Sequence, residues 1–226
     1  MRRSEINTAQ RAALALLREH RFQPPLWMTW TPADWAAAPE VSAYCRARQM
    51  GWDVTDFGSG DFERRGLLLI CTRNGLLHTP GEVTYAEKLL VIGEGQVTPL
   101  HTHRHKTEDI INRGGGILTV ELATLDPATG TAGSAPVTVL TDGRARTAAA
   151  GAAVHLHPGE SITLHPGTLH RFYAQPGHGP VLAGEVSAVN DDLTDNLFLD
   201  PVGRFPQIEE DEPILHPLWS DLPAPT

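Results

Sequence analysis

Three histidines within five positions, followed shortly by a glutamate, make HTHRHKTEDIINRGGG (101–116) the stretch best suited to chemistry. His101 and His103 are two residues apart, so on a β-strand both side chains point to the same face. His105 could continue that row or enter a turn, where it would be exposed or would only support a ligand. Glu108 can approach the same point if the polar residues RHKTED turn the chain. Imidazole and carboxylate groups gathered in this way are typical of a metal site.

The spacing of this stretch is more specific than its histidines. Five residues are separated by five, one, four and six positions: Gly95, His101, His103, Glu108 and Gly115. This spacing resembles the first sequence motif of the cupins, which implies a mainly β double-stranded β-helix, or jelly-roll barrel. The three glycines that end the stretch allow a close approach of the backbone before the next strand.

A companion motif lies downstream in GESITLHPGTLH, which has a turn at Pro166 and Gly167 and then His170 at the start of a strand. It departs from the cupin pattern at His165, where a proline is usual, and at Ala174, where asparagine is frequent. The turn and the histidine are intact. We therefore expect His170 to be the fourth ligand.

Three imidazoles and one carboxylate would leave room for water or substrate on a five- or six-coordinate divalent metal ion. Mn, Fe, Zn, Co and Ni all suit such a set, whereas a structural zinc site more often has thiolate ligands and a closed tetrahedron. The alternative is that these residues are polar groups at the surface. Three other histidines have no acidic residue at comparable spacing, so we expect structural or surface roles for His155, His157 and His165.

The use of lysine is unusual, because the chain has two lysines and sixteen arginines. Lys88 lies on the predicted strand YAEKLLVIG that leads into the first motif, and Lys106 lies two residues before Glu108. A compact ammonium that can titrate is something a guanidinium cannot replace. We predict a functional role for Lys106, whereas for Lys88 function and packing remain equal alternatives.

Acidic residues follow in GEVSAVNDDLTDN (184–196). Glu185 stands in an apolar strand and can face the inside of a closed barrel, where its carboxylate would reach a ligand and move protons. The neighbouring Asp191 and Asp192 are expected to form a solvated loop or to meet an arginine.

Composition narrows the class of partner. A net charge of -9 argues against nucleic acid as a partner, and we expect a small molecule instead.

No stretch of the N-terminus is apolar enough for a signal peptide or a membrane span. Cys45 and Cys71 form no CxxC pattern, which favours free thiols and the cytoplasm.

Two kinds of pattern divide the chain. Up to about residue 50 the apolar period is helical, and we expect Asn7 or Thr8 to cap a first helix and Thr31 to cap a second. From about Gly66 short strands alternate with turns. We therefore predict three parts: an N-terminal helical region packed on the barrel (1–74), a cupin barrel with the metal site (75–200) and a C-terminal extension (201–226). The extension either wraps onto the barrel or a partner, or forms a loose tail.

The sequence also resembles one cupin family over roughly residues 75 to 212. EDIINRGGG, EVSAVNDD and RFPQIEEDE, together with the strands that lead into them, are similar to the cupin-type D-lyxose isomerases. This resemblance implies a metal-dependent aldose-ketose isomerase, commonly with manganese, that interconverts D-lyxose and D-xylulose and often D-mannose and D-fructose. It also implies a homodimer.

Carried over by position, the resemblance implies His101, His103, Glu108 and His170 as metal ligands, with Lys88, Lys106 and Glu185 near the substrate. Moving the carbonyl from C1 to C2 requires a proton to leave C2 and return at C1 through an enediol. We assign the transfer between C2 and C1 to Glu185. Lys106 would move protons between the sugar oxygens or support the oxyanion. The reverse assignment is still open. Lys88 and Arg204 would orient hydroxyl groups.

Two other functions use the same ligands. A cupin dioxygenase would bind iron and consume oxygen, and a noncatalytic sugar-binding cupin would form no product. The lysine and the acid inside the barrel favour proton transfer over both, because oxygen activation does not require them.

Overall fold

Two antiparallel sheets form most of the computed structural model, which describes residues 1–223. The larger sheet has the order β1-β2-β3-β12-β5-β10-β7-β8 and the smaller one β13-β4-β11-β6-β9. The strands are β1 (Gly51–Thr55), β2 (Leu67–Arg73), β3 (Tyr85–Ile92), β4 (His101–His103), β5 (Glu108–Gly115), β6 (Leu118–Thr124), β7 (Val137–Thr141), β8 (Arg144–Ala148), β9 (Ala153–Leu156), β10 (Ser161–Leu164), β11 (Thr168–Ala174), β12 (Val181–Ala188) and β13 (Asn196–Phe198).

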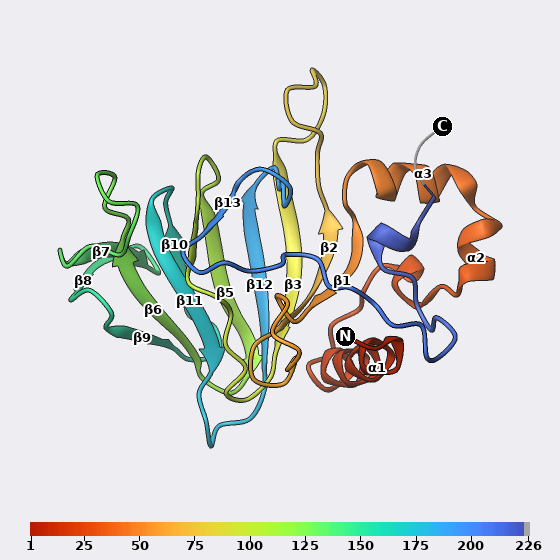
Figure 1. Cartoon of the computed structure of the whole chain (residues 1–226), viewed down its shortest axis with the longest axis horizontal. Coiled ribbons are helices and arrows are strands. Elements are labelled where there is room, and N and C mark those ends of the chain that lie inside the picture. The colour runs from red at the N-terminus through yellow and green to blue at the C-terminus, as the bar shows by residue number, and fades with distance from the viewer. Residues whose placement is uncertain (224–226) are drawn as a thin grey trace.

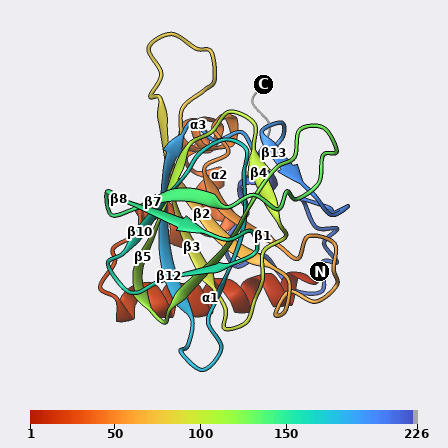
Figure 2. The ribbon, with the colours of Figure 1, turned by 90° about the vertical axis from the view of Figure 1, so that its left-hand side faces the viewer.

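The two sheets face each other, and Figures 1 and 2 show them curving into a barrel with the helices gathered at one side. One apolar core fills the space between them, with Leu90 and Ile110 from the larger sheet and Val120 and Phe172 from the smaller one. This arrangement is a jelly roll, which confirms the predicted cupin barrel with its N-terminal helices.

Strand β2 is buried on both faces, and its side chains alternate between two cores. Leu67 and Leu69 point into the barrel, whereas Leu68 and Ile70 pack against the helical side. Side chains of a strand alternate between faces, so a continuous apolar run such as LLLI can serve both. The helices are thus attached to the outer face of the larger sheet.

The helix α1 (Arg3–Glu19) covers that outer face and is seen end-on in Figure 1. Its apolar residues Ile6, Ala13, Leu14 and Leu17 recur at the spacing of one helical face, and all are buried. The helix begins earlier than expected, so the prediction that Asn7 or Thr8 caps it is wrong. Asn7 lies inside the helix and donates to Glu212 Oε2 at 2.8 Å.

Three shorter helices complete the helical side: α2 (Pro32–Ala36), α3 (Pro39–Ala47) and the 3-10 helix η1 (Leu26–Thr29). The predicted cap of α2 is confirmed, because Thr31 Oγ1 accepts from the Asp34 amide at 3.3 Å and Pro32 occupies the first helical position. Cys45 and Cys71 are free and buried between these helices and the sheet. No helix within residues 1–223 is long and apolar enough to cross a membrane.

The sheet starts earlier in the chain than residue 75. Strand β1, which was not expected, pairs with β2, and β2 pairs with β3 in the same sheet. The GWDVT segment is short and carries an aspartate, so its sequence gives little sign of a strand. Its residues are nevertheless buried throughout, because β1 lies between β2 and the C-terminal segment.

The triple glycine allows the close backbone approach that the sequence predicts. Gly115 has a φ of +88°, and a Cβ there would lie 2.2 Å from the Pro180 carbonyl oxygen. A Cβ at Gly116 would lie 2.5 Å from the Gly179 carbonyl oxygen. Any larger residue would therefore collide with the loop before β12.

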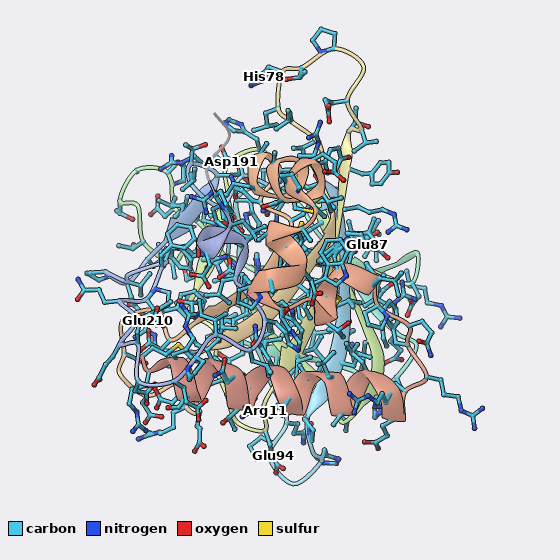
Figure 3. All side chains as sticks on the ribbon, turned by 90° about the vertical axis from the view of Figure 1, so that its right-hand side faces the viewer. Arg11, His78, Glu87, Glu94, Asp191 and Glu210 are labelled. Atoms are coloured by element: carbon cyan, nitrogen blue, oxygen red, sulfur yellow. The ribbon has the colours of Figure 1, made fainter. Side chains whose placement is uncertain are left out.

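Residues 205–222 wrap back across the helical side and include a final turn, η2 (Trp219–Asp221). Arg3, 1% exposed, donates to Glu210 Oε1 at 2.7 Å and to Asp221 Oδ2 at 3.0 Å. Figure 3 shows Glu210 beside one end of α1. Of the two alternatives for the described part of the C-terminal extension, wrapping onto the protein is therefore the one observed.

Replacing Arg3 with alanine should lower the free energy of unfolding by about 2–3 kcal/mol, because it removes hydrogen bonds between charged groups and leaves carboxylates without a partner. Urea denaturation would measure the change. Arg11→Ala on the exposed face of α1 is the matched control and should change stability little. Equal stability of the two variants would contradict this view of how the C-terminal segment is held.

Candidate metal and sugar site

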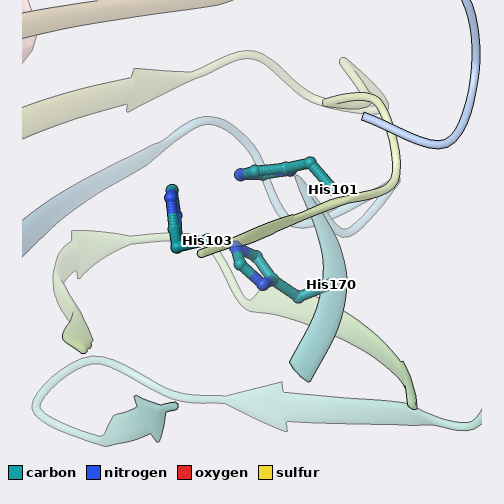
Figure 4. Close-up of side chains that lie close together, drawn as sticks. All are labelled: His101, His103 and His170. Atoms are coloured by element: carbon teal, nitrogen blue, oxygen red, sulfur yellow. The ribbon is translucent and has the colours of Figure 1, made fainter. Parts of the chain in front are cut away.

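Three histidines meet inside the barrel at the smaller sheet. His101 and His103 lie on β4, His170 lies on β11, and His170 pairs directly with His101 across the two strands. Each ring offers one nitrogen within 4.8 Å of the others, so the group could hold a metal ion (Figure 4). The period of the strand therefore places both residues of the HTH segment on one face, as predicted.

The hydrogen bonds of two rings fit a metal ligand. His101 Nδ1 lies 2.9 Å from the Pro99 carbonyl, and His170 Nδ1 lies 3.0 Å from the Thr168 carbonyl. A carbonyl only accepts, so Nδ1 carries the hydrogen and Nε2 keeps its lone pair. His170 Nε2 is buried without a hydrogen-bond partner in the described chain. Burial also holds the pKa of His101 well below its usual range, which favours the neutral ring that a metal needs.

Glu108 reaches the histidines from the first residue of β5. Its Oε1 lies 3.2 Å from His103 Nε2 and 3.1 Å from His170 Nε2. Burial opposes ionisation, but Lys106 and His103 outweigh it and hold the pKa of Glu108 well below its usual range. The turn predicted between His103 and Glu108 is thus present, and the carboxylate stands beside the imidazole group as an anion.

Lys106 connects this group to a second carboxylate. Its Nζ lies 2.9 Å from Glu108 Oε2 and 2.8 Å from Glu185 Oε1, and the side chain is buried. Burial alone would lower the pKa of Lys106, but the charges of Glu108 and Glu185 raise it above its usual value. The side chain is therefore an ammonium ion that can donate hydrogen bonds.

Glu185 lies on β12, directly opposite Lys88 on β3 in the antiparallel register. Lys88 Nζ is 3.3 Å from the same oxygen, Oε1, that contacts Lys106. Within residues 1–223, no hydrogen bond or ion pair engages Glu185 Oε2. One oxygen of the carboxylate is thus held by two ammonium groups, and the other is free to accept a proton.

A second buried charge network lies beyond Lys88. Arg204 Nη2 contacts Asp53 Oδ2 at 2.7 Å and Asp192 Oδ2 at 3.2 Å, and Lys88 Nζ lies 3.9 Å from Asp192 Oδ1. Despite burial, Lys88 and Arg204 hold the pKa of Asp192 below its usual range. Of the two alternatives for this aspartate, meeting an arginine is therefore the one observed, and the residue is buried instead of solvated.

All eight predicted site residues come together. Seven of them line one interior cavity, and His170 completes the histidine group at its wall. The rest of the wall is mostly apolar, with polar side chains from Thr98, Asp192 and Asn196. The Phe198 ring stacks on His101 with centroids 5.3 Å apart. The seven lining residues are Lys88, His101, His103, Lys106, Glu108, Glu185 and Arg204.

The other histidines lie outside this cavity. His105 is exposed in the turn after β4, where it lines a separate pocket. The three histidines for which surface roles were expected are exposed as well: His155, His157 and His165.

Sequence reasoning missed several polar residues of the site. Asp53 is an acid between Trp52 and Val54 on a buried strand, the same signal that pointed to Glu185. Asp195 and Asn196 gave no such signal, because they come from the loop before β13 and the start of that strand, where polar residues are ordinary.

The barrel and its interior histidine group place the protein among the cupins. Residues 1–222 match the family model described as D-lyxose isomerase. The chain belongs to the D-lyxose isomerase family and is an aldose-ketose isomerase, which confirms the predicted class of enzyme. Membership in this family favours that activity over the dioxygenase and the noncatalytic sugar-binding protein.

Two curated relatives support the family. A D-lyxose/D-mannose isomerase of Serratia proteamaculans is 48% identical over 202 residues, which cover 88% of this chain and 82% of the relative. A D-lyxose/D-mannose isomerase of Escherichia coli O157:H7 is 45% identical over 219 residues, 94% of each chain. The solved L-ribose isomerase of Geodermatophilus obscurus shares the fold, with a TM-score of 0.62 at 17% identity over 92% of this chain and 98% of its own.

His170→Ala should weaken binding of Mn²⁺ by more than about 100-fold, because loss of a ligand costs more than loss of an outer hydrogen-bond partner. Isothermal titration calorimetry would measure the dissociation constant. His155→Ala on the exposed face of β9 removes the same group and should bind Mn²⁺ normally. Unchanged affinity in His170→Ala would contradict a metal site at this cluster.

Proposed function

We propose that this protein interconverts D-lyxose with D-xylulose and D-mannose with D-fructose, using Mn²⁺ held by His101, His103, Glu108 and His170. The names of the relatives and the buried chain of charges Glu108-Lys106-Glu185 support the proposal. The observation that carries it is the position of Lys106. Its ammonium joins Glu108 of the metal-binding group to Glu185, a carboxylate able to move protons.

The two aldoses suit one site for a chemical reason. D-lyxose and D-mannose have the same configuration at C2, C3 and C4, so the proton to be removed from C2 lies on the same face of each sugar. A metal ion, when bound, would stabilise the negative charge that develops on O1 and O2. Selectivity between the sugars then depends on the part of the cavity that meets the end of the sugar away from C1.

We assign the transfer between C2 and C1 to Glu185. Its free oxygen, Oε2, accepts the proton from C2 and returns it to C1, while Oε1 stays fixed by Lys88 and Lys106. An ammonium held between two carboxylates is poorly suited to be a base. Lys106 therefore supports the charge on the sugar oxygens and moves the proton between them.

The remaining cations orient the substrate. Lys88 donates to Asn190 Oδ1, and Arg204 is held by Asp53 and Asp192 on the far wall of the cavity. Guanidinium and carboxylate groups fixed in this way can bind hydroxyl groups of the sugar without reorganising. We further propose a cytoplasmic homodimer, since both cysteines are free and the family resemblance implies a dimer.

Removal of the metal should abolish turnover, and Mn²⁺ should restore it. The protein is treated with a chelator, dialysed and supplied with Mn²⁺, and D-xylulose from D-lyxose and D-fructose from D-mannose are measured side by side. The ratio of kcat/KM values then gives the preferred sugar. A folded, metal-loaded protein that forms neither ketose would refute the proposed substrates.

Glu185→Gln should lower kcat by about 10³-fold or more while metal content stays normal, because the amide keeps the shape of the side chain and cannot take the proton. Ketose formation and bound metal are measured on the same samples. Glu87→Gln, on β3 but outside the cavity, is the control and should remain active. Near-normal turnover in Glu185→Gln would end the assignment of the base.

A further inference from the structure

The three histidines of the cluster differ in what holds the nitrogen that faces away from it. His101 and His170 each use a backbone carbonyl two residues earlier in the chain, from Pro99 and Thr168. These partners are part of the backbone and survive any change of side chain. The orientation of these two rings therefore depends on the strands alone.

His103 depends on a side chain instead. Its Nδ1 lies 3.4 Å from Asp195 Oδ2, and within residues 1–223 neither atom has a hydrogen-bond partner at closer range. Both residues are buried, His103 to 5% exposure and Asp195 to 7%. A buried ring nitrogen and a buried carboxylate oxygen that face each other and have no other partner can pair only with one another.

The carboxylate is fixed by its other oxygen. Asp195 Oδ1 accepts from the His105 amide at 2.9 Å, and the Arg104 amide donates to the Asp195 carbonyl at 3.0 Å. The next residue, Asn196, pairs with His103 in the register of β13 and β4. The loop before β13 is thus attached to β4 at the level of the histidine.

We propose that Asp195 is a positioning residue for the metal site, which keeps the hydrogen of His103 on Nδ1 and its lone pair on Nε2. The inference rests on the proposed metal site. A carboxylate behind a ligating imidazole sets the tautomer and the ring orientation and makes the ring a stronger ligand, and its loss typically weakens metal binding 10- to 100-fold.

An amide cannot take over both tasks of this carboxylate. If the oxygen of an asparagine accepts from the His105 amide, its NH₂ group faces His103 Nδ1 and favours the tautomer with the hydrogen on Nε2, where it blocks the metal. If the amide is turned, the NH₂ group opposes the His105 N–H. Asp195→Asn is therefore a nearly isosteric test of the charge and of the acceptor.

Asp195→Asn should raise the dissociation constant for Mn²⁺ about 10- to 100-fold in isothermal titration calorimetry. The control is Asp191→Asn, which removes the same charge from the same loop, where Asp191 caps the turn at Leu193 and Thr194. Its dissociation constant should stay within about twofold, because a more exposed charge is screened by solvent. Equal losses in both variants, or none in Asp195→Asn, would overturn the inference.

A double-mutant cycle separates positioning from a general structural effect. Zn²⁺ is the probe, since nitrogen ligands bind it more tightly than Mn²⁺ and weakened variants stay measurable. If Asp195 acts through His103, Asp195→Asn should weaken Zn²⁺ binding in the native background and change it by less than about twofold when His103→Ala is present. The same loss in both backgrounds would show that Asp195 acts by another route.

The cycle also distinguishes the two proposals. Unchanged Zn²⁺ affinity in His103→Ala would refute the metal site itself. Weak binding in His103→Ala together with normal binding in Asp195→Asn would refute only the role of Asp195.

Discussion

The burial of one ammonium ion between two carboxylates is the constraint on which the rest of the site depends. Lys106, Glu108 and Glu185 are all nearly inaccessible to water, and a charge in such a place is stable only when its partners are held at hydrogen-bond distance. Glu108 comes from β5, Glu185 from β12 and Lys106 from the turn after β4. The three segments must therefore keep their register, and the histidines of the smaller sheet are brought against the same carboxylate.

The same constraint explains why the polar network continues beyond Glu185. Glu185 contacts Lys88, Lys88 lies near Asp192, and Asp192 contacts Arg204, which ends on Asp53 of β1. Each charge is compensated by the next, and the last one, Asp53, lies opposite Leu69 on the face of the larger sheet that points into the barrel. The strands that carry the chemistry and the segments that cover them are therefore held together by charge as well as by apolar contacts.

The sequence predicted the residues whose positions follow from local geometry. The period of a strand places His101 and His103 together, and a polar turn returns Glu108 to them. Asp195 acts through a partner distant in the chain, so no local pattern indicates it. Asp53 had the local signal of an acid on a buried strand, but its partner Arg204 is distant in the chain. Strand β1 was missed because it is only five residues long and carries an aspartate. The start of α1 was misplaced because Glu5 and Asp211 of the C-terminal segment accept from its first amides, and neither Asn7 nor Thr8 caps it.

The C-terminal segment gives this protein a particular order of assembly. Trp219 Nε1 lies 3.4 Å from Asp53 Oδ2, the carboxylate that holds Arg204, while Asp221 and Glu210 hold Arg3 near the start of the chain. A ribosome delivers the N-terminal helix first and these partners last. Arg3 and Asp53 therefore stay hydrated until these later segments have been synthesised, and their buried contacts form only when the C-terminal segment packs against the helical side.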